Sequence, residues 1–237
     1  MGSMKLNLKK FGLCVIFIFF SIGILGCTLE NSLQSDGYSI FVNDETIKEK
    51  VDEVRSSSDY TTIDNIASNF LNAVVAVEDK RFYNHGGIDI KSIVRATVAN
   101  IKARSIIQGG STITQQLAKN LFLDGKQDIS RKISEILIAR KLEKLYSKEE
   151  ILELYANIVY YGNGYYGIND ASYGYFNSAP ENLTLNQGSL LAGVLQAPNS
   201  YNPKKYLAKA QGRQKEVLNA MVENRYITEK QMDSIIK

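Results

Sequence analysis

The sequence predicts a mainly α-helical fold. Apolar residues recur at helical spacing from about residue 64 to the end, and polar residues that cap helices precede several of these segments. The chain contains only three prolines and has no strongly alternating series of the kind that marks strands. With 237 residues, of which 44% are hydrophobic, it is long enough for one domain with a substantial core.

The helices are expected in the following order. Asp64 can cap a first helix, whose apolar positions follow a 3.6-residue period as far as Val75. Further helices are expected over residues 90–101, from Ser111 or Thr112 to Leu123, over residues 129–145, and from capping sequences that begin at Ser147, Thr184 and Thr228. This pattern contains no internal repeat.

A lysine-flanked apolar segment occupies residues 11–27, after three residues typical of a vector-derived leader (1–3). One interpretation is an uncleaved membrane anchor, although the segment is slightly short of the ~20 residues that span a bilayer. The other is a lipoprotein signal, because Ile24-Leu25-Gly26-Cys27 resembles a lipobox with Cys27 as the acylated residue. We favour the lipoprotein signal, since polar residues follow Cys27 at once.

Both interpretations place the rest of the chain outside the cytoplasmic membrane and tethered to it. Residues 28–60 are polar and predict a stalk, with a short strand at 38–42, so the folded domain is expected over 61–237.

The composition excludes several kinds of site. A net charge of +3 fits an anionic substrate or membrane surface, and no nucleic-acid motif is present, so nucleic acid is not an expected partner. Both cysteines lie in the N-terminal segment, and the chain has one histidine. A thiol nucleophile, a disulfide and a protein-built zinc site in the domain are therefore not expected, nor is an organic cofactor.

Glu78 is the most informative residue of the domain. It follows the apolar run 73–77 and opens a segment that contains the single histidine, His85, and two glycines. A carboxylate at the edge of an apolar wall is desolvated, which raises its pKa toward values useful for proton transfer. The alternative is a helix that ends in a solvated acidic pair before a turn.

Three further clusters carry polar chemistry. In residues 109–120, glycines followed by Ser111 and Thr112 at a helix start are expected to expose backbone N–H groups that suit an anion. Arg131 and Glu135 are four residues apart on a helix, so the simplest interpretation is an ion pair. Residues 151–157 predict an amphipathic helix, followed by a loop rich in tyrosine and glycine.

Together, these clusters resemble the glycosyltransferase family 51 domain, the peptidoglycan polymerase also found in class A penicillin-binding proteins. The match runs from about residue 65 to about 205, in order and with the family's spacing. Its first four motifs are carried by Glu78, Asp79, Phe82, His85 and Gly87; by Gly109, Ser111, Thr112, Thr114, Gln115 and Gln116; by Arg131, Lys132 and Glu135; and by Glu153, Tyr155, Asn157 and Gly162. Gln187 and Gln127 depart from the pattern, where Glu and Arg are usual.

The resemblance implies a lysozyme-like helical fold with a smaller membrane-proximal lobe, and lipid II as substrate. Glu78 would be the general base that activates the acceptor 4-hydroxyl, and Glu135 would assist the departing pyrophosphate, directly or through Mg or Mn. The implied binding residues are Asp79, Phe82, His85, Ser111, Thr112, Thr114, Gln115, Gln116, Lys119, Asn120, Arg131, Lys132, Tyr155 and Asn157. The implied partners are the membrane, the growing glycan on undecaprenyl pyrophosphate, and other cell-wall synthesis proteins.

Two other functions remain open at this point. A lysozyme-like peptidoglycan hydrolase also needs one glutamate with a raised pKa, although a neutral glycan needs no pyrophosphate-binding cations. A weakly active lipoprotein that binds lipid II is supported by Gln127 and Gln187 alone.

Overall fold

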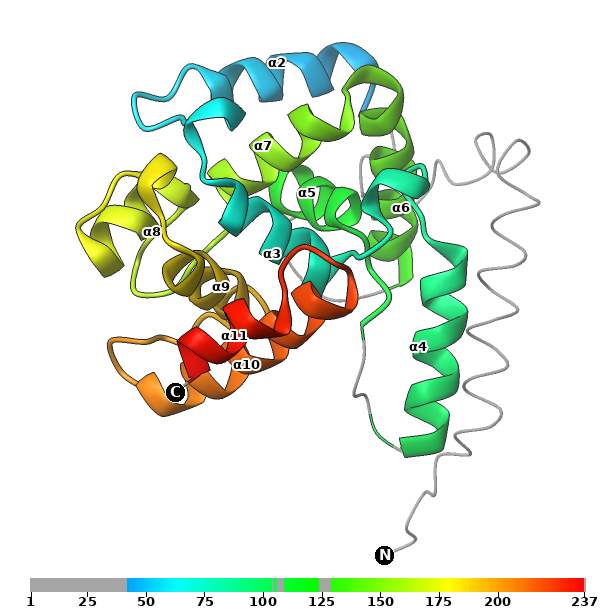
Figure 1. Cartoon of the computed structure of the whole chain (residues 1–237). Helices are drawn as coiled ribbons and strands as arrows, with labels where there is room; N and C mark the ends of the chain where they lie inside the picture. Colours follow the sequence, from blue (N-terminus) through cyan, green and yellow to red (C-terminus); the bar gives the residue numbers. More distant parts are fainter. Residues whose placement is uncertain (1–41, 104, 106–108, 124–128, 237) are drawn as a thin grey trace, which may run out of the picture. The chain divides into compact units, whose positions relative to one another are not determined.

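The computed structural model of the chain describes residues 42–103, 105, 109–123 and 129–236 (Figure 1). These residues belong to two compact units. The first contains Asp89–Ser111, and the second contains Asn43–Ile88 and Thr112–Lys237. The described part of the chain is mainly helical, as the sequence predicts, and its β-type pairing is limited to two isolated bridges.

The α-helices of the second unit are α2 (Asp44–Arg55), α3 (Ser68–Glu78), α5 (Ile113–Phe122), α6 (Ile129–Leu145), α7 (Lys148–Ile158), α8 (Gly167–Phe176), α9 (Leu185–Val194), α10 (Leu207–Glu223) and α11 (Glu229–Ile236). Three 3-10 turns, η2 (Ile63–Asn65), η3 (Phe82–Asn84) and η4 (Pro180–Asn182), lie between them. The first unit contributes α4 (Ile90–Ala103).

The predicted helix starts are largely confirmed. Thr112, Ser147 and Thr184 each form a capping box with the Gln or Glu three residues later, and α6 has the predicted bounds. The first predicted helix is wrong at its start, because Asp64 lies in η2 and α3 begins only at Ser68. A tertiary hydrogen bond from the Ala67 N–H to the Pro180 carbonyl (3.0 Å) holds the residue before α3, which no local sequence pattern indicates.

The predicted stalk must be corrected in its second half. Residues 44–55 form α2, capped by the Asn43 side chain, which accepts a hydrogen bond from the Thr46 N–H (2.7 Å). Ile47 and Val51 are fully buried one turn apart, and α2 packs against α7. The compact unit therefore begins at Asn43 rather than at residue 61.

Two groups of packed helices make the core of the second unit. Helix α3 packs against α9 and α10, which also pack against each other, and α5 packs against α6 and α7 (Figure 1). Helices α3 and α9 approach closely at Gly188, where an added Cβ would lie 2.9 Å from the Phe70 nitrogen. Helix α3, whose last residue is Glu78, therefore packs against two other helices, and the close contact with α9 lies near its N-terminal end.

In the first unit, Asp89 caps α4 by accepting a hydrogen bond from the Ser92 N–H (3.0 Å). Ile90, Val94 and Val98 follow at helical spacing and are 70%, 48% and 44% exposed, so α4 presents an apolar face. None of the described helices is long and apolar enough to cross a membrane. The predicted anchor or lipoprotein signal, with Cys27, lies outside the described residues, as does the stalk up to residue 41.

Candidate active site

Glu78 lies at the C-terminal end of α3, after an apolar run of which residues 73–76 are buried. Its Oε2 accepts a hydrogen bond from Nε2 of Gln116 on α5, at 2.9 Å. The Oε1 of the same Gln116 amide accepts a hydrogen bond from the hydroxyl of Tyr155 on α7, at 3.1 Å. Three helices thus form one chain of hydrogen bonds that ends at the Glu78 carboxylate.

The pKa of Glu78 is raised above the ordinary value for glutamate, chiefly because burial disfavours the charged form. The Gln116 hydrogen bond and the positive charges of Arg213 and Lys119 lower this pKa, and the neighbouring Asp79 raises it. Burial outweighs the cations, so the sequence-based expectation for Glu78 is confirmed in direction. A carboxylate with this property is suited to accept a proton near neutral pH.

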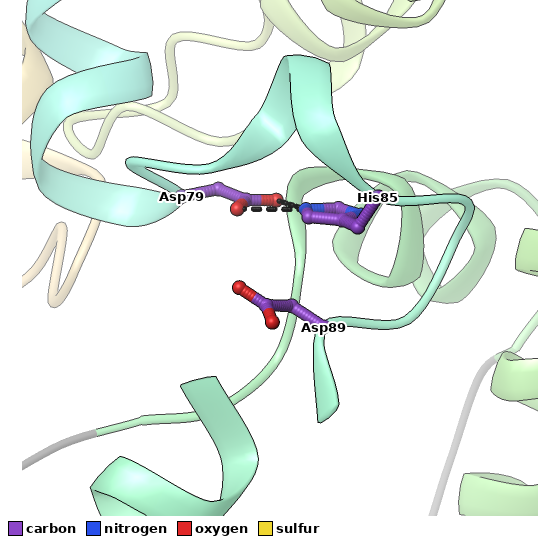
Figure 2. Close-up of side chains that lie close together, drawn as sticks. All are labelled: Asp79, His85 and Asp89. Carbon is purple, nitrogen blue, oxygen red and sulfur yellow. Dashed lines mark hydrogen bonds and ion pairs between the residues drawn. The ribbon is translucent and has the colours of Figure 1, made fainter. Parts of the chain in front are cut away.

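Asp79 and His85 form a buried pair within the second unit (Figure 2). The His85 Nε2 lies 2.9 Å from both carboxylate oxygens of Asp79, and Oδ2 also accepts a hydrogen bond from the Ile113 N–H (3.2 Å). Asp79 directly follows Glu78. Its bonds to His85 and to the Ile113 N–H therefore join the end of α3 to the η3 turn and to the start of α5. Asp89, also drawn in Figure 2, belongs to the first unit, where it caps α4.

More backbone N–H groups at the start of α5 have hydrogen-bond partners within the protein than the sequence suggests. The Ile113 N–H donates to the Asp79 carboxylate, and the Gln115 N–H donates to the Thr112 hydroxyl. The Thr112 hydroxyl in turn donates to the Gly87 carbonyl (2.7 Å). The Thr114 hydroxyl donates to Glu143 (2.6 Å). The expectation that this helix start exposes free N–H groups to an anion is therefore wrong at these two positions.

Beyond its first turn, α5 carries polar side chains that are at least partly exposed. Gln116 is half-buried beside Glu78, and the predicted binding residues Lys119 and Asn120, one turn further on, are exposed. Ser111, predicted with them, belongs to the first unit. The second unit thus brings an amide and a cation of α5 to the region of Glu78.

Glu135 is a second buried carboxylate, 3% exposed, on α6. Its Oε2 lies 3.6 Å from Nη1 of Arg131, and its Oε1 pairs with Lys132. The predicted i,i+4 ion pair is therefore present, with a second cation added. Since α5 packs against α6 and carries Gln116, the two carboxylates lie on helices joined through α5.

The donor set around Glu135 does not favour a divalent cation. Mg and Mn prefer several oxygen ligands, whereas both Glu135 oxygens already face a lysine or an arginine. The structure therefore supplies a cationic site that suits an anionic substrate group.

Other predicted site residues are buried or bonded to other parts of the protein. Phe82 is fully buried, with the Lys148 ammonium 4.4 Å from its ring centroid. The Asn157 side chain accepts from the Thr61 N–H and donates to the Thr61 carbonyl, both at 2.8 Å. Tyr155 is also fully buried, and its link to Glu78 is the hydrogen bond from its hydroxyl to Gln116.

Arg213 was not predicted from the sequence, and Glu153 was named only as a motif residue, without a structural role. Arg213 lies on α10, which packs against α3, and its charge acts on Glu78. Its side chain is 10% exposed, and among the described residues its buried Nε has no hydrogen-bond partner. Glu153 accepts from the Ile63 N–H (2.6 Å) and pairs with Tyr60. No sequence pattern marks either role, because each depends on residues 90 or more positions away.

Glu78 is a partly buried carboxylate with a raised pKa, held by an amide and flanked by cations, which is an arrangement suited to acid–base chemistry. Residues 43–222 match the family model of the transglycosylases. The chain therefore belongs to the transglycosylase family.

Curated relatives agree with this assignment. The chain is 45% identical over 177 residues to penicillin-binding protein 1A of Aquifex aeolicus, covering 75% of this chain and 24% of that protein. It is 43% identical over 178 residues to penicillin-binding protein 1A of Neisseria gonorrhoeae, covering 75% of this chain and 22% of that protein. With penicillin-binding protein 1F of Bacillus subtilis it shares 41% identity over 196 residues, which are 81% of this chain and 28% of that protein. The matched region thus spans about a quarter of the length of these relatives.

Proposed function

We propose that this chain polymerises lipid II into β-1,4-linked glycan strands, with release of undecaprenyl pyrophosphate, at the outer face of the cytoplasmic membrane. The observation that carries this proposal is the Glu78 carboxylate, whose raised pKa and amide partner occur within a transglycosylase domain. The chemistry requires a base that removes a proton from a sugar hydroxyl as the hydroxyl attacks.

In the proposed reaction, Glu78 accepts the proton of the acceptor 4-hydroxyl while the hydroxyl oxygen bonds to the anomeric carbon of the donor. The bond between that carbon and the pyrophosphate breaks, and pyrophosphate leaves with the electron pair. Inversion at the anomeric carbon converts the α-linked donor into a β link. Because burial raises the pKa of Glu78, the ionised carboxylate is a stronger base than an exposed glutamate.

The departing pyrophosphate gains negative charge, and the cations near the site are proposed to stabilise it. Arg131 and Lys132, both held by Glu135, can present N–H donors to phosphate oxygens, and the exposed Lys119 adds a third positive charge. Glu135 in this proposal orients the two α6 cations.

Several residues that the sequence suggested as substrate ligands are proposed to position the site instead. Their polar groups are already bonded within the second unit or their rings are buried: Asp79, Phe82, His85, Thr112, Thr114, Gln115 and Asn157. Gln116, Lys119 and Asn120 remain the proposed contacts to the substrate from α5.

The lipid part of the substrate requires an apolar surface close to a membrane. Helix α4 offers Ile90, Val94 and Val98 as an exposed apolar face, together with Lys91 and Arg95 on the same helix. We propose that this face contacts the bilayer, and that the N-terminal segment tethers the chain through acylated Cys27 or as an intact anchor.

The test is polymerisation of purified lipid II by the chain in detergent, with glycan products separated by gel electrophoresis. Glu78→Gln should abolish polymer formation, whereas Glu181→Gln, which changes an exposed glutamate, should leave it intact. Polymer made at the wild-type rate by Glu78→Gln would refute the assignment. Release of muropeptides from finished peptidoglycan, without polymer formation from lipid II, would instead support a hydrolase.

A further inference from the structure

The hydrogen bonds around Gln116 determine which way its amide group faces. The ionised Glu78 carboxylate can only accept hydrogen bonds, so the amide nitrogen must face it, as it does at 2.9 Å. On the other side, the Tyr155 hydroxyl lies 3.1 Å from the amide oxygen and donates to it. A reversed amide would place oxygen against carboxylate and leave the tyrosine proton without its acceptor.

Tyr155 is suited to be a permanent donor in this arrangement. Its side chain is fully buried, and burial raises its pKa well above the ordinary range of tyrosine, with the Glu78 charge acting in the same direction. The hydroxyl therefore stays protonated throughout the pH range in which Glu78 titrates. It cannot reach a substrate at the surface, because no part of the ring is exposed.

We propose that Tyr155 is a positioning residue that acts through Gln116, so that Glu78 Oε2 is held by the amide and Oε1 is the oxygen that accepts the sugar proton. Among the described residues, Oε1 has no hydrogen-bond partner. When Oε1 takes up the proton, Oε2 still accepts from the amide, so Gln116 need not move during the reaction. This inference rests on the proposed role of Glu78 as base and assigns its two oxygens different tasks.

Other charged groups also act on Glu78, and the test must separate them. They are Asp79, the next residue in the chain, Lys119 on α5 and Arg213 on α10, while α9, which packs on α3, has no titratable side chain. None of these groups bonds to the Gln116 amide. A change at Tyr155 that depends on Gln116 therefore reports the hydrogen-bond chain alone.

The experiment is a double-mutant cycle with Tyr155→Phe and Gln116→Ala. Tyr155→Phe keeps the ring and removes only the hydroxyl, and we expect kcat to fall about fivefold with little change in KM, the usual effect of losing one hydrogen bond. In the Gln116→Ala background, the same substitution should change kcat less than about twofold. Equal effects in both backgrounds would overturn the proposal, because they would mean that Tyr155 acts independently of Gln116.

A second measurement needs no substrate. Carboxyl carbon NMR of labelled protein should show that Tyr155→Phe raises the pKa of Glu78 in the wild-type background and leaves it unchanged beside Gln116→Ala. Titration that follows this pattern, in a protein that does not polymerise lipid II, would uphold the positioning of Glu78 by Tyr155 through Gln116 and refute the proposed function. An unchanged Glu78 titration in Tyr155→Phe would refute the inference and leave the function untouched.

Tyr161→Phe is the matched control. Tyr161 is equally buried in the same unit, but its hydroxyl donates to the Ala156 carbonyl (3.1 Å) and not to the Gln116 amide. Its loss should lower thermal stability to a similar extent and leave both kcat and the titration of Glu78 unchanged. A similar fall of kcat in both variants would show that the effect of Tyr155 is structural.

Discussion

The close approach of α3 and α9 predicts that one substitution has opposite effects on stability in two helices. Gly188 in α9 and Gly212 in α10 both lie inside helices, where replacing glycine by alanine stabilises a protein by about 0.5–1 kcal/mol. At Gly212 an added Cβ meets no atom within 4 Å, so Gly212→Ala should show this gain in full.

At Gly188 the new Cβ would lie 2.9 Å from the Phe70 nitrogen and 3.1 Å from its Cα, both backbone atoms of α3. Ordinary contact begins at 3.4 Å, so the helices must separate by 3.4 − 2.9 = 0.5 Å. Overpacking of this kind costs about 1–3 kcal/mol, which exceeds the helix gain. Gly188→Ala should therefore be about 1 kcal/mol less stable than the wild type.

Thermal unfolding followed by circular dichroism measures both variants under the same conditions. A difference of about 2 kcal/mol between them corresponds to about 4–8 °C in Tm for a domain of this size. Because α3 ends at Glu78, Gly188→Ala should also reduce polymerisation, whereas Gly212→Ala should not. If Gly188→Ala were stabilised as much as Gly212→Ala, the helices would not be packed as closely as the structure shows.

Two further predictions concern stability. The folded state raises the pKa of Glu78, so its contribution to stability is present below the ordinary glutamate pKa and is lost as pH rises through the raised value. Glu78→Gln should accordingly unfold at a higher temperature than the wild type at about pH 8, with the difference shrinking toward about pH 4; a difference independent of pH would contradict this. Ile47→Ala should cost about 2–5 kcal/mol because Ile47 is fully buried, whereas Lys48→Ala, at an exposed position of the same helix, should cost less than about 0.5 kcal/mol. An unchanged Tm in Ile47→Ala would restore the stalk interpretation of α2.

How well the sequence predicts the structure differs from one helix to another. Helix starts marked by a capping box were predictable because the signal lies within four residues, as at Ser147 and Thr184. Helix α2 was missed because only two apolar side chains, Ile47 and Val51, mark its buried face among many charged residues. Its stability comes from packing against α7 and from the Arg55–Glu150 pair (2.8 Å), which sequence periodicity does not reveal.

At the candidate site, too, some properties could be predicted from the local sequence and others could not. The apolar run before Glu78 was enough to predict the direction of its pKa shift, because such a run is expected to be buried and to bring the adjoining carboxylate out of water. The sequence could not distinguish side chains that face the substrate from those that hold the framework. Asn157 carries the same amide group as Gln116 and Thr114 carries a polar hydroxyl, but their partners are the Thr61 backbone and Glu143.

By itself, the sequence determined the helical class, most helix starts, the two carboxylates and the resemblance that the family model supports. These properties depend on short-range periodicity or on the identity of single residues. Only the tertiary structure decided that Gln116 faces Glu78, that the Tyr155 hydroxyl donates to Gln116, and that Arg213 acts on the same carboxylate. The physical reason is distance along the chain: helices α3, α5, α7 and α10 meet at the site, and hydrogen bonds and charges between them depend on packing that no local pattern records.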